Sequence, residues 1–265
     1  MTPQLLLQHI DSGEPWPAQA AAGTDLAGAY QTALAVRALR LSRCEVPRGF
    51  KIGFTNSGIW PRYNVFAPIW GTVWESTLND CDDLSMGVVS LDHTCQPRIE
   101  PETVFGLRAT PPAGATLTQL FDALDWVAPG FEVVQSHQPD WKFQAADTVA
   151  DSGLHARLLV GKRRPIGEVA TDAASVEAAL ALASVRLFKD SKLIDHGKGA
   201  NVLGSPLRAL HHFLTELRQC PGAPDLKAGD VVTTGTWTDA WPVAVGERWT
   251  AQFDAPLSTL QIRFS

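Results

Sequence analysis

Large apolar residues recur at helical spacing in several segments of the chain. The pattern is clearest over 116–127, where they fall at i, i+3, i+4, i+7 and i+10. These residues are Leu117, Leu120, Phe121, Leu124 and Val127. The same reasoning predicts helices over 25–42 and 173–183. It also predicts a helix that begins at Pro206, with Ser205 as its N-cap.

Short apolar runs without helical period predict strands, most of them in the second half of the chain. They cover 98–107, 131–135, 230–234, 248–253 and 260–264, with a hairpin that joins 185–188 to 193–194. Helices and strands do not alternate as they would in a parallel α/β fold. The pattern therefore favours an α+β fold, with an N-terminal helical or loop segment over 1–70 and a β-rich part over 71–265.

Composition excludes several classes of protein. The chain has 265 residues, 45% of them apolar and 19% charged, which is typical of a globular domain rather than a disordered or collagen-like chain. The formal net charge of −6 leaves no global basic surface for nucleic acid. No apolar run approaches the roughly 20 residues that a membrane span needs, and the N-terminus lacks the basic region of a signal peptide. We therefore expect a cytoplasmic protein without a membrane or nucleic-acid partner.

Three glutamates are the most informative candidates for a functional site. Glu100 and Glu102 lie two apart in a predicted strand, so their side chains share one face. Glu132 lies within a second apolar run, between Phe131 and Val133. Neighbouring carboxylates repel unless a cation neutralises them, and oxygen ligands suit Mg²⁺, Mn²⁺ or Ca²⁺. Solvated glutamates on an exposed strand face are the alternative, and spacing alone does not exclude it.

Lys51 is a candidate acid, base or carbonyl-polarising group. It lies between Phe50 and Ile52, and burial there would lower the pKa of its amine. A surface lysine with a partly buried stem is the alternative. The polar segment 140–153 has neither helical nor strand period, which is typical of a binding loop as well as of an ordinary solvated loop.

Five motifs in order resemble one enzyme family over roughly residues 25–265. They read KIGFTN, QPRIEPE, FEVVQS with DW and DTVADS, GANVLGSPLRAL, and LKAGDVVTTGT. The chain resembles the 2-keto-4-pentenoate hydratases and 4-oxalocrotonate decarboxylases of the fumarylacetoacetate hydrolase superfamily. The resemblance implies a mixed β-roll with flanking helices, with 71–265 as the catalytic domain. It also implies Glu100, Glu102 and Glu132 as Mg²⁺ or Mn²⁺ ligands, Lys51 as the catalytic lysine, and a homo-oligomer.

The sequence departs from the family pattern at two places. Where the hydratases have Asn-Ala-Ser after the DTVAD motif, this chain has Ser152-Gly153-Leu154. The family's acid after the lysine does not align, and Glu75 is the nearest acid and the candidate to activate water. We expect Ser152, Leu154 and Thr236 to contact the substrate. The Trp-rich segment 60–74 indicates an aromatic pocket, in which Arg62 could meet a second carboxylate.

The resemblance predicts a metal-dependent hydratase that acts on a small 2-oxo acid. It would add water to a 2-hydroxy-2,4-dienoate from aromatic-ring cleavage and give a 4-hydroxy-2-oxo acid. A decarboxylase of a 2-oxo-3-enedioate is the first alternative, because both reactions pass through a similar enolate. An acylpyruvate hydrolase and an inactive structural partner, in complex with a hydratase or decarboxylase, rank below these.

Overall fold

Two mixed β-sheets form the centre of the protein. The computed structural model describes residues 1–17, 20–21, 23, 25–81 and 86–265. Within these residues the larger sheet has the strand order β2-β1-β11-β5-β6-β7-β3, with β12 beside β5 and β8 beside β6. Its strands are β1 Pro47–Gly53, β2 Ile69–Trp74, β3 Leu78–Asp80, β5 Arg98–Leu107, β6 Leu124–Val134, β7 His155–Val160, β8 Arg164–Pro165, β11 Val231–Thr236 and β12 Trp241–Pro242.

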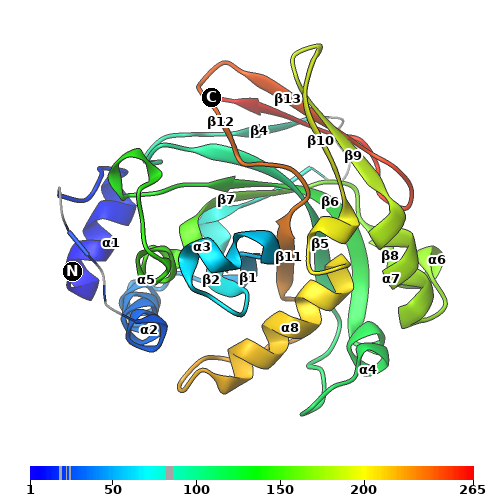
Figure 1. Ribbon diagram of the computed structural model, residues 1–265, viewed down its shortest axis with the longest axis horizontal. Coiled ribbons are helices and arrows are strands. Elements are labelled where there is room, and N and C mark those ends of the chain that lie inside the picture. The colour runs from blue at the N-terminus through cyan, green and yellow to red at the C-terminus, as the bar shows by residue number, and fades with distance from the viewer. Residues whose placement is uncertain (18–19, 22, 24, 82–85) are drawn as a thin grey trace.

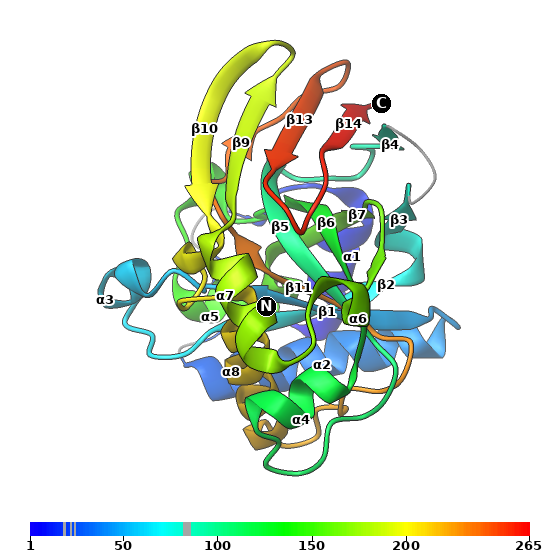
Figure 2. The same ribbon diagram turned by 90° about the vertical axis from the view of Figure 1, so that its right-hand side faces the viewer.

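The smaller sheet has the order β10-β9-β13-β14-β4 and lies at the top of the molecule in Figure 2. Its strands are β4 Gly87–Val89, β9 Ser184–Lys189, β10 Lys192–Lys198, β13 Arg248–Phe253 and β14 Leu260–Phe264. The hairpin β9–β10 turns at Asp190 and Ser191, as its sequence predicts. Parallel pairs occur in both sheets, β1 with β11 and β4 with β14, among mostly antiparallel ones. The predicted α+β fold with mixed sheets and flanking helices is confirmed.

The helices flank the larger sheet (Figure 1). They are α1 Pro3–Ser12, α2 Leu26–Ser42, α3 Trp60–Tyr63, α4 Leu117–Asp122, α5 Ala145–Ala150, α6 Ile166–Val169, α7 Ala173–Leu182 and α8 Pro206–Gln219. Helix α8 packs on β11, β1 and β2 through a row of buried leucines, and α2 packs on α1 and α5. No helix among the described residues is long and apolar enough to cross a membrane.

The predicted helix over 116–127 is wrong beyond Asp122. Helix α4 begins with a capping box between Thr116 and Gln119 and ends at Asp122. The chain then enters β6, which pairs with β5 along its whole length, from Leu124 opposite Leu107 to Val134 opposite Arg98. Both faces of most of β6 are buried, so its apolar residues do not alternate with polar ones and match helical spacing by coincidence.

The larger sheet takes strands from both sides of the expected boundary at residue 70. β1 comes from the segment 1–70, and β2 runs from Ile69 to Trp74 across that boundary. β1 lies between β2 and β11, and it carries Lys51. The division at residue 70 stays a prediction, but the N-terminal segment contributes directly to the sheet that holds the candidate site.

Loss of the Ser205 cap should destabilise the whole domain. The buried Ser205 hydroxyl accepts a hydrogen bond from the Arg208 N–H at 3.2 Å, at the start of the core helix α8. We expect Ser205→Ala to lower the free energy of unfolding by about 1 kcal/mol, measured by urea denaturation. Ser42→Ala at the exposed end of α2 is the control, with an expected change within about 0.5 kcal/mol. Equal effects of the two substitutions would contradict this role of the cap.

Candidate active site

Three carboxylates meet on one face of the larger sheet. Glu100 on β5 stands directly opposite Glu132 on β6, and Glu102 follows two residues after Glu100. Opposite residues of a ladder share a face, and so do residues two apart. One carboxylate oxygen from each of the three lies within 4.8 Å of the others. Glu102 and Glu132 are fully buried and Glu100 is half-buried, so the alternative of solvated glutamates on an exposed face is excluded.

The cluster has unsatisfied negative charge. Burial raises the pKa of Glu100 to about 7, and the nearby Lys51 ammonium only partly opposes this. Burial, together with repulsion from the other two carboxylates, raises the pKa of Glu102 well above its usual range. Glu102 Oε2 accepts the Gly235 N–H at 2.7 Å, but Glu102 Oε1 accepts no hydrogen bond from the described residues, and among them Glu132 Oε2 has only the ion pair with Lys51 Nζ at 3.3 Å. Buried carboxylate oxygens with so few donors fit a hard divalent cation.

Lys51 is the cation that faces this cluster. Its Nζ lies 3.3 Å from Glu132 Oε2 and donates a hydrogen bond to the Gly153 carbonyl at 2.8 Å. The side chain is buried, which excludes the alternative of a surface lysine. Burial alone would lower its pKa, but the attraction of Glu132, Glu100 and Glu102 outweighs burial and raises it. The predicted lowering of this pKa is therefore wrong, because the sequence does not reveal how many carboxylates surround the amine.

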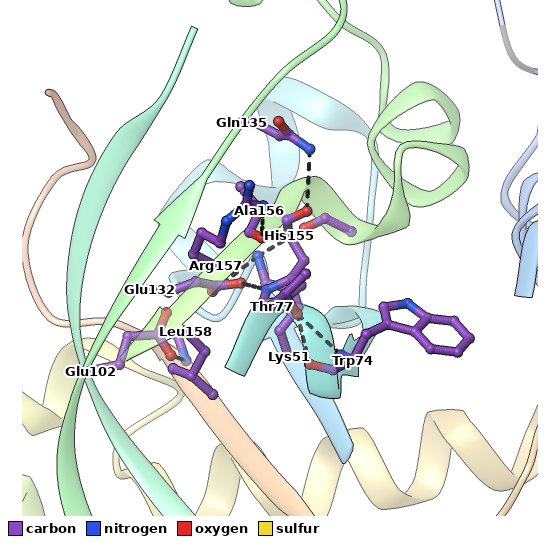
Figure 3. A network of polar contacts seen from close by, with 12 residues as sticks. Lys51, Trp74, Thr77, Glu102, Glu132, Gln135, His155, Ala156, Arg157 and Leu158 are labelled. Atoms are coloured by element: carbon purple, nitrogen blue, oxygen red, sulfur yellow. Dashed lines mark hydrogen bonds and ion pairs between the residues drawn. The ribbon is translucent and has the colours of Figure 1, made fainter. Parts of the chain in front are cut away.

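His155 orients Glu132 and was not placed by the sequence analysis. Its Nδ1 lies 2.9 Å from Glu132 Oε1, and its Nε2 lies 2.9 Å from Thr77 Oγ1 (Figure 3). Burial lowers the pKa of His155, which favours a neutral ring that donates from Nδ1 to Glu132. A histidine at the start of the apolar run HARLLV was the available signal, but its partners are distant in sequence: Glu132 lies on β6, and Thr77 ends a 3₁₀ turn.

A cavity of about 280 Å³ opens beside Lys51 and Glu100. Its other lining residues are Ile52, Gly53, Phe54, Thr55, Asn56, Ile59, Arg62, Tyr63, Ile69, Arg98, Val134, Trp141, Phe143, Gly153, Leu154, Gly235, Thr236, Asp239 and Ala240. Aromatic rings contribute much of the lining: Phe54 and Phe143 each stack with Tyr63. The Arg98 guanidinium lies over the Trp141 ring, 4.1 Å from its centre.

The Trp-rich segment contributes less to this cavity than expected. Tyr63 lines the cavity, but Trp70 and Trp74 are buried elsewhere. Trp70 stacks on Tyr30, and the Arg40 guanidinium lies over the Trp74 ring. The aromatic wall is completed by Trp141 and Phe143, from the polar segment that indicated a binding loop.

The structure brings together most of the predicted site residues, with two exceptions. Arg62, Leu154 and Thr236 line the cavity with Lys51. Ser152 lies two residues before Leu154 and lines a separate small space beside α2 and Trp74. Glu75 is exposed and pairs with Arg48 at 3.2 Å, outside the residues that line the cavity. Its placement does not support a role in activating water.

Several known proteins are similar to this chain in sequence. A 2-hydroxyhexa-2,4-dienoate hydratase of Comamonas testosteroni is 32% identical over 239 residues, which cover 89% of this chain and 85% of the relative. A 4-oxalocrotonate decarboxylase of Pseudomonas sp. (strain CF600) is 28% identical, over 90% of this chain and 85% of the relative. A search against models of protein families found no match.

Solved structures of other proteins share the fold of this chain. The 4-oxalocrotonate decarboxylase of Pseudomonas putida G7, complexed with magnesium and adipate, superimposes with a TM-score of 0.85 at 25% identity. The match covers 99% of this chain and 97% of the other. A fumarylpyruvate hydrolase of Pseudomonas aeruginosa, in complex with Mn²⁺ and pyruvate, shares the fold with a TM-score of 0.56 at 16% identity, over 83% of this chain and 89% of the other.

The long sequence match to the Comamonas hydratase, together with the fold of these structures, establishes the relationship. This chain belongs to the family of 2-keto-4-pentenoate hydratases and 4-oxalocrotonate decarboxylases.

Proposed function

We propose that this chain is a divalent-metal-dependent lyase that hydrates a 2-hydroxy-2,4-dienoate to a 4-hydroxy-2-oxo acid. One observation carries the proposal: three carboxylates, two fully buried and one half-buried, cluster with the buried Lys51, and Lys51 and Glu100 line a cavity. The names of the sequence relatives, hydratases and decarboxylases, support a lyase.

Glu100, Glu102 and Glu132 would hold the metal. Their oxygens form a ligand set suited to Mg²⁺ or Mn²⁺, and one of these oxygens, Glu102 Oε1, accepts no hydrogen bond from the described residues. When bound, the ion supplies Lewis-acid chemistry that polarises a 2-oxo acid and stabilises negative charge on its oxygens. His155 and Thr77 keep the Glu132 carboxylate in one orientation, as outer-shell partners of metal ligands do.

Lys51 would hold the proton that is transferred to the substrate. Its raised pKa keeps it as an ammonium, which can stabilise charge on the oxo oxygen and return a proton to the substrate. Protonation of the dienol at C5 gives an α,β-unsaturated ketone, and water then adds at C4. The apolar side chains of Ile69 and Leu154 line the cavity and restrict the access of bulk water to the chain of the substrate.

Decarboxylation of a 2-oxo-3-enedioate is the second candidate. In that reaction the C–C bond to the distal carboxylate breaks, CO₂ leaves, and the bonding electrons enter the conjugated system. Two arginines of the cavity, Arg62 and Arg98, favour it because a guanidinium suits a second carboxylate. The structural relative that is complexed with the diacid adipate also supports this candidate.

Turnover with and without metal tests the proposal directly. We expect 2-hydroxypenta-2,4-dienoate to lose its absorbance with Mg²⁺ or Mn²⁺ and without CO₂ release. EDTA should abolish turnover, and added metal should restore it. CO₂ release from 2-oxo-3-hexenedioate would identify the decarboxylase instead. Turnover that survives chelation would contradict the role of the metal.

Substitution of Glu102 should affect thermal stability differently without and with metal. Without metal, Glu102→Gln removes repulsion between buried carboxylates, so we expect it to melt at or above the temperature of the wild type. Metal at about 100 times its Kd should raise the wild-type melting temperature by roughly 5–10 °C, with little shift in the variant. Thermal melts in EDTA and in Mn²⁺ measure both effects. Glu75→Gln is the control and should keep the full metal shift.

Substitution of Arg62 should raise KM for a diacid substrate and leave KM for a monoacid substrate unchanged. Its guanidinium is exposed at the cavity, so partial screening limits its contribution. We expect Arg62→Gln to raise KM for 2-oxo-3-hexenedioate by about tenfold, the loss of one charged hydrogen bond. KM for 2-hydroxypenta-2,4-dienoate should stay unchanged. An equal rise for both substrates in steady-state assays would count against a contact with the second carboxylate.

A further inference from the structure

The turn that touches Lys51 has an unfavourable backbone. Ser152, Gly153 and Leu154 follow one another with φ angles of 57°, 66° and 67°. Left-handed conformations are disfavoured for residues with a side chain, and two of these three residues are not glycine. Such a turn persists only where surrounding contacts hold it in place.

This turn fixes the position of the Lys51 amine. The Gly153 carbonyl accepts the hydrogen bond from Lys51 Nζ at 2.8 Å. The turn also packs on β2 without spare room, since a Cβ added to Gly71 would lie 1.9 Å from the Ser152 carbonyl oxygen. A shift of the turn would therefore move the acceptor that orients Lys51 relative to Glu132.

A buried Asp–His pair stands immediately before the turn. Asp151 is 2% exposed and His137 is fully buried. The Asp151 carboxylate accepts the His137 backbone N–H at 2.9 Å on one oxygen and the ring Nδ1–H at 2.6 Å on the other. Asp151 directly follows α5, at the helix end where the dipole disfavours negative charge. Both hydrogen bonds to His137 offset this cost and fix the carboxylate in one orientation.

His137 is itself held by the segment that follows α1. The Trp16 N–H donates to the His137 carbonyl at 2.7 Å, and the Trp16 and His137 rings stack with their centres 6.3 Å apart. Neither Asp151 nor His137 lines the cavity beside Lys51. Asp151 therefore lies outside the cavity and is joined to it by the turn that follows it in the chain.

We propose that Asp151 and His137 are positioning residues for Lys51. The pair anchors the beginning of the left-handed turn, and the turn presents the Gly153 carbonyl to the amine. This inference rests on the proposed function in one respect, that Lys51 takes part in turnover. Misplacement of a reacting group by about 1 Å can cost about 100-fold in rate, so loosening of the turn should appear in kcat.

Asp151→Asn and His137→Leu test the inference by kinetics. We expect each to lower kcat about 10- to 100-fold at saturating substrate and metal, with an unchanged Kd for Mn²⁺. His137→Asn should retain most of kcat, because its amide N–H can replace the ring donor. Val176→Ala, in the buried face of α7, is the control for lost stability and should leave kcat unchanged. Wild-type kcat in Asp151→Asn would overturn the inference.

Amide hydrogen exchange tests the anchor without any need for turnover. The Leu154 N–H donates to the Asp151 carbonyl at 2.8 Å within the turn, so it should exchange slowly in the wild type. In Asp151→Asn we expect faster exchange in peptides that cover 151–156, with no such change in Val176→Ala. If the wild type shows no turnover, the proposed function fails, and hydrogen exchange alone then decides whether Asp151 anchors the turn. Unchanged protection of these peptides in Asp151→Asn overturns the inference, and faster exchange confined to them supports it.

Discussion

The clustering of three carboxylates, two of them fully buried, is the constraint on which the rest of this structure depends. The ladder between β5 and β6 places Glu100, Glu102 and Glu132 on one face, where burial weakens the screening of their charges by water. Ionised, they carry three negative charges. Lys51 attracts all three, and Arg98 attracts Glu100. A divalent cation bound between the three carboxylates would neutralise much of the negative charge that remains. Without metal, burial and the repulsion between these carboxylates raise the pKa of both Glu100 and Glu102.

Backbone groups and neutral side chains orient this cluster without adding charge. The Gly235 N–H fixes one oxygen of Glu102, and the neutral His155 ring fixes one oxygen of Glu132. The Gly153 carbonyl does the same for the Lys51 ammonium. An additional cation in these places would compete with a metal for the carboxylates, whereas dipoles restrict their orientation and leave the charge available. In this fold, uncharged dipoles therefore orient the charged groups, and the carboxylates stay free to be neutralised by a cation.

The sequence predicts the charged groups of the site better than their surroundings. The spacing of Glu100 and Glu102 is enough to place them on one face of a strand. Glu132 joins them only through its register with Glu100, and the misassigned helix over 116–127 concealed how far β6 extends along β5. His155 and the Gly153 carbonyl reach the site through tertiary contacts that leave no local pattern. The sign of the Lys51 pKa shift likewise depends on three partners from two other strands.

Hydration and decarboxylation place the same demand on the metal and Lys51, because both need negative charge stabilised on a 2-oxo acid. The charged cluster therefore cannot by itself select between them. We propose that selection falls to the outer part of the cavity, where the far end of a substrate would meet Arg62, Arg98 and the aromatic wall. An apolar end would lie against Tyr63 and Phe143, whereas a carboxylate would need a guanidinium to replace its water. One departure from the family pattern, at Gly153 and Leu154, also lies at this cavity, whereas Glu75 lies outside it. The departure at Leu154 therefore alters the outer cavity and leaves the three glutamates and Lys51 in place.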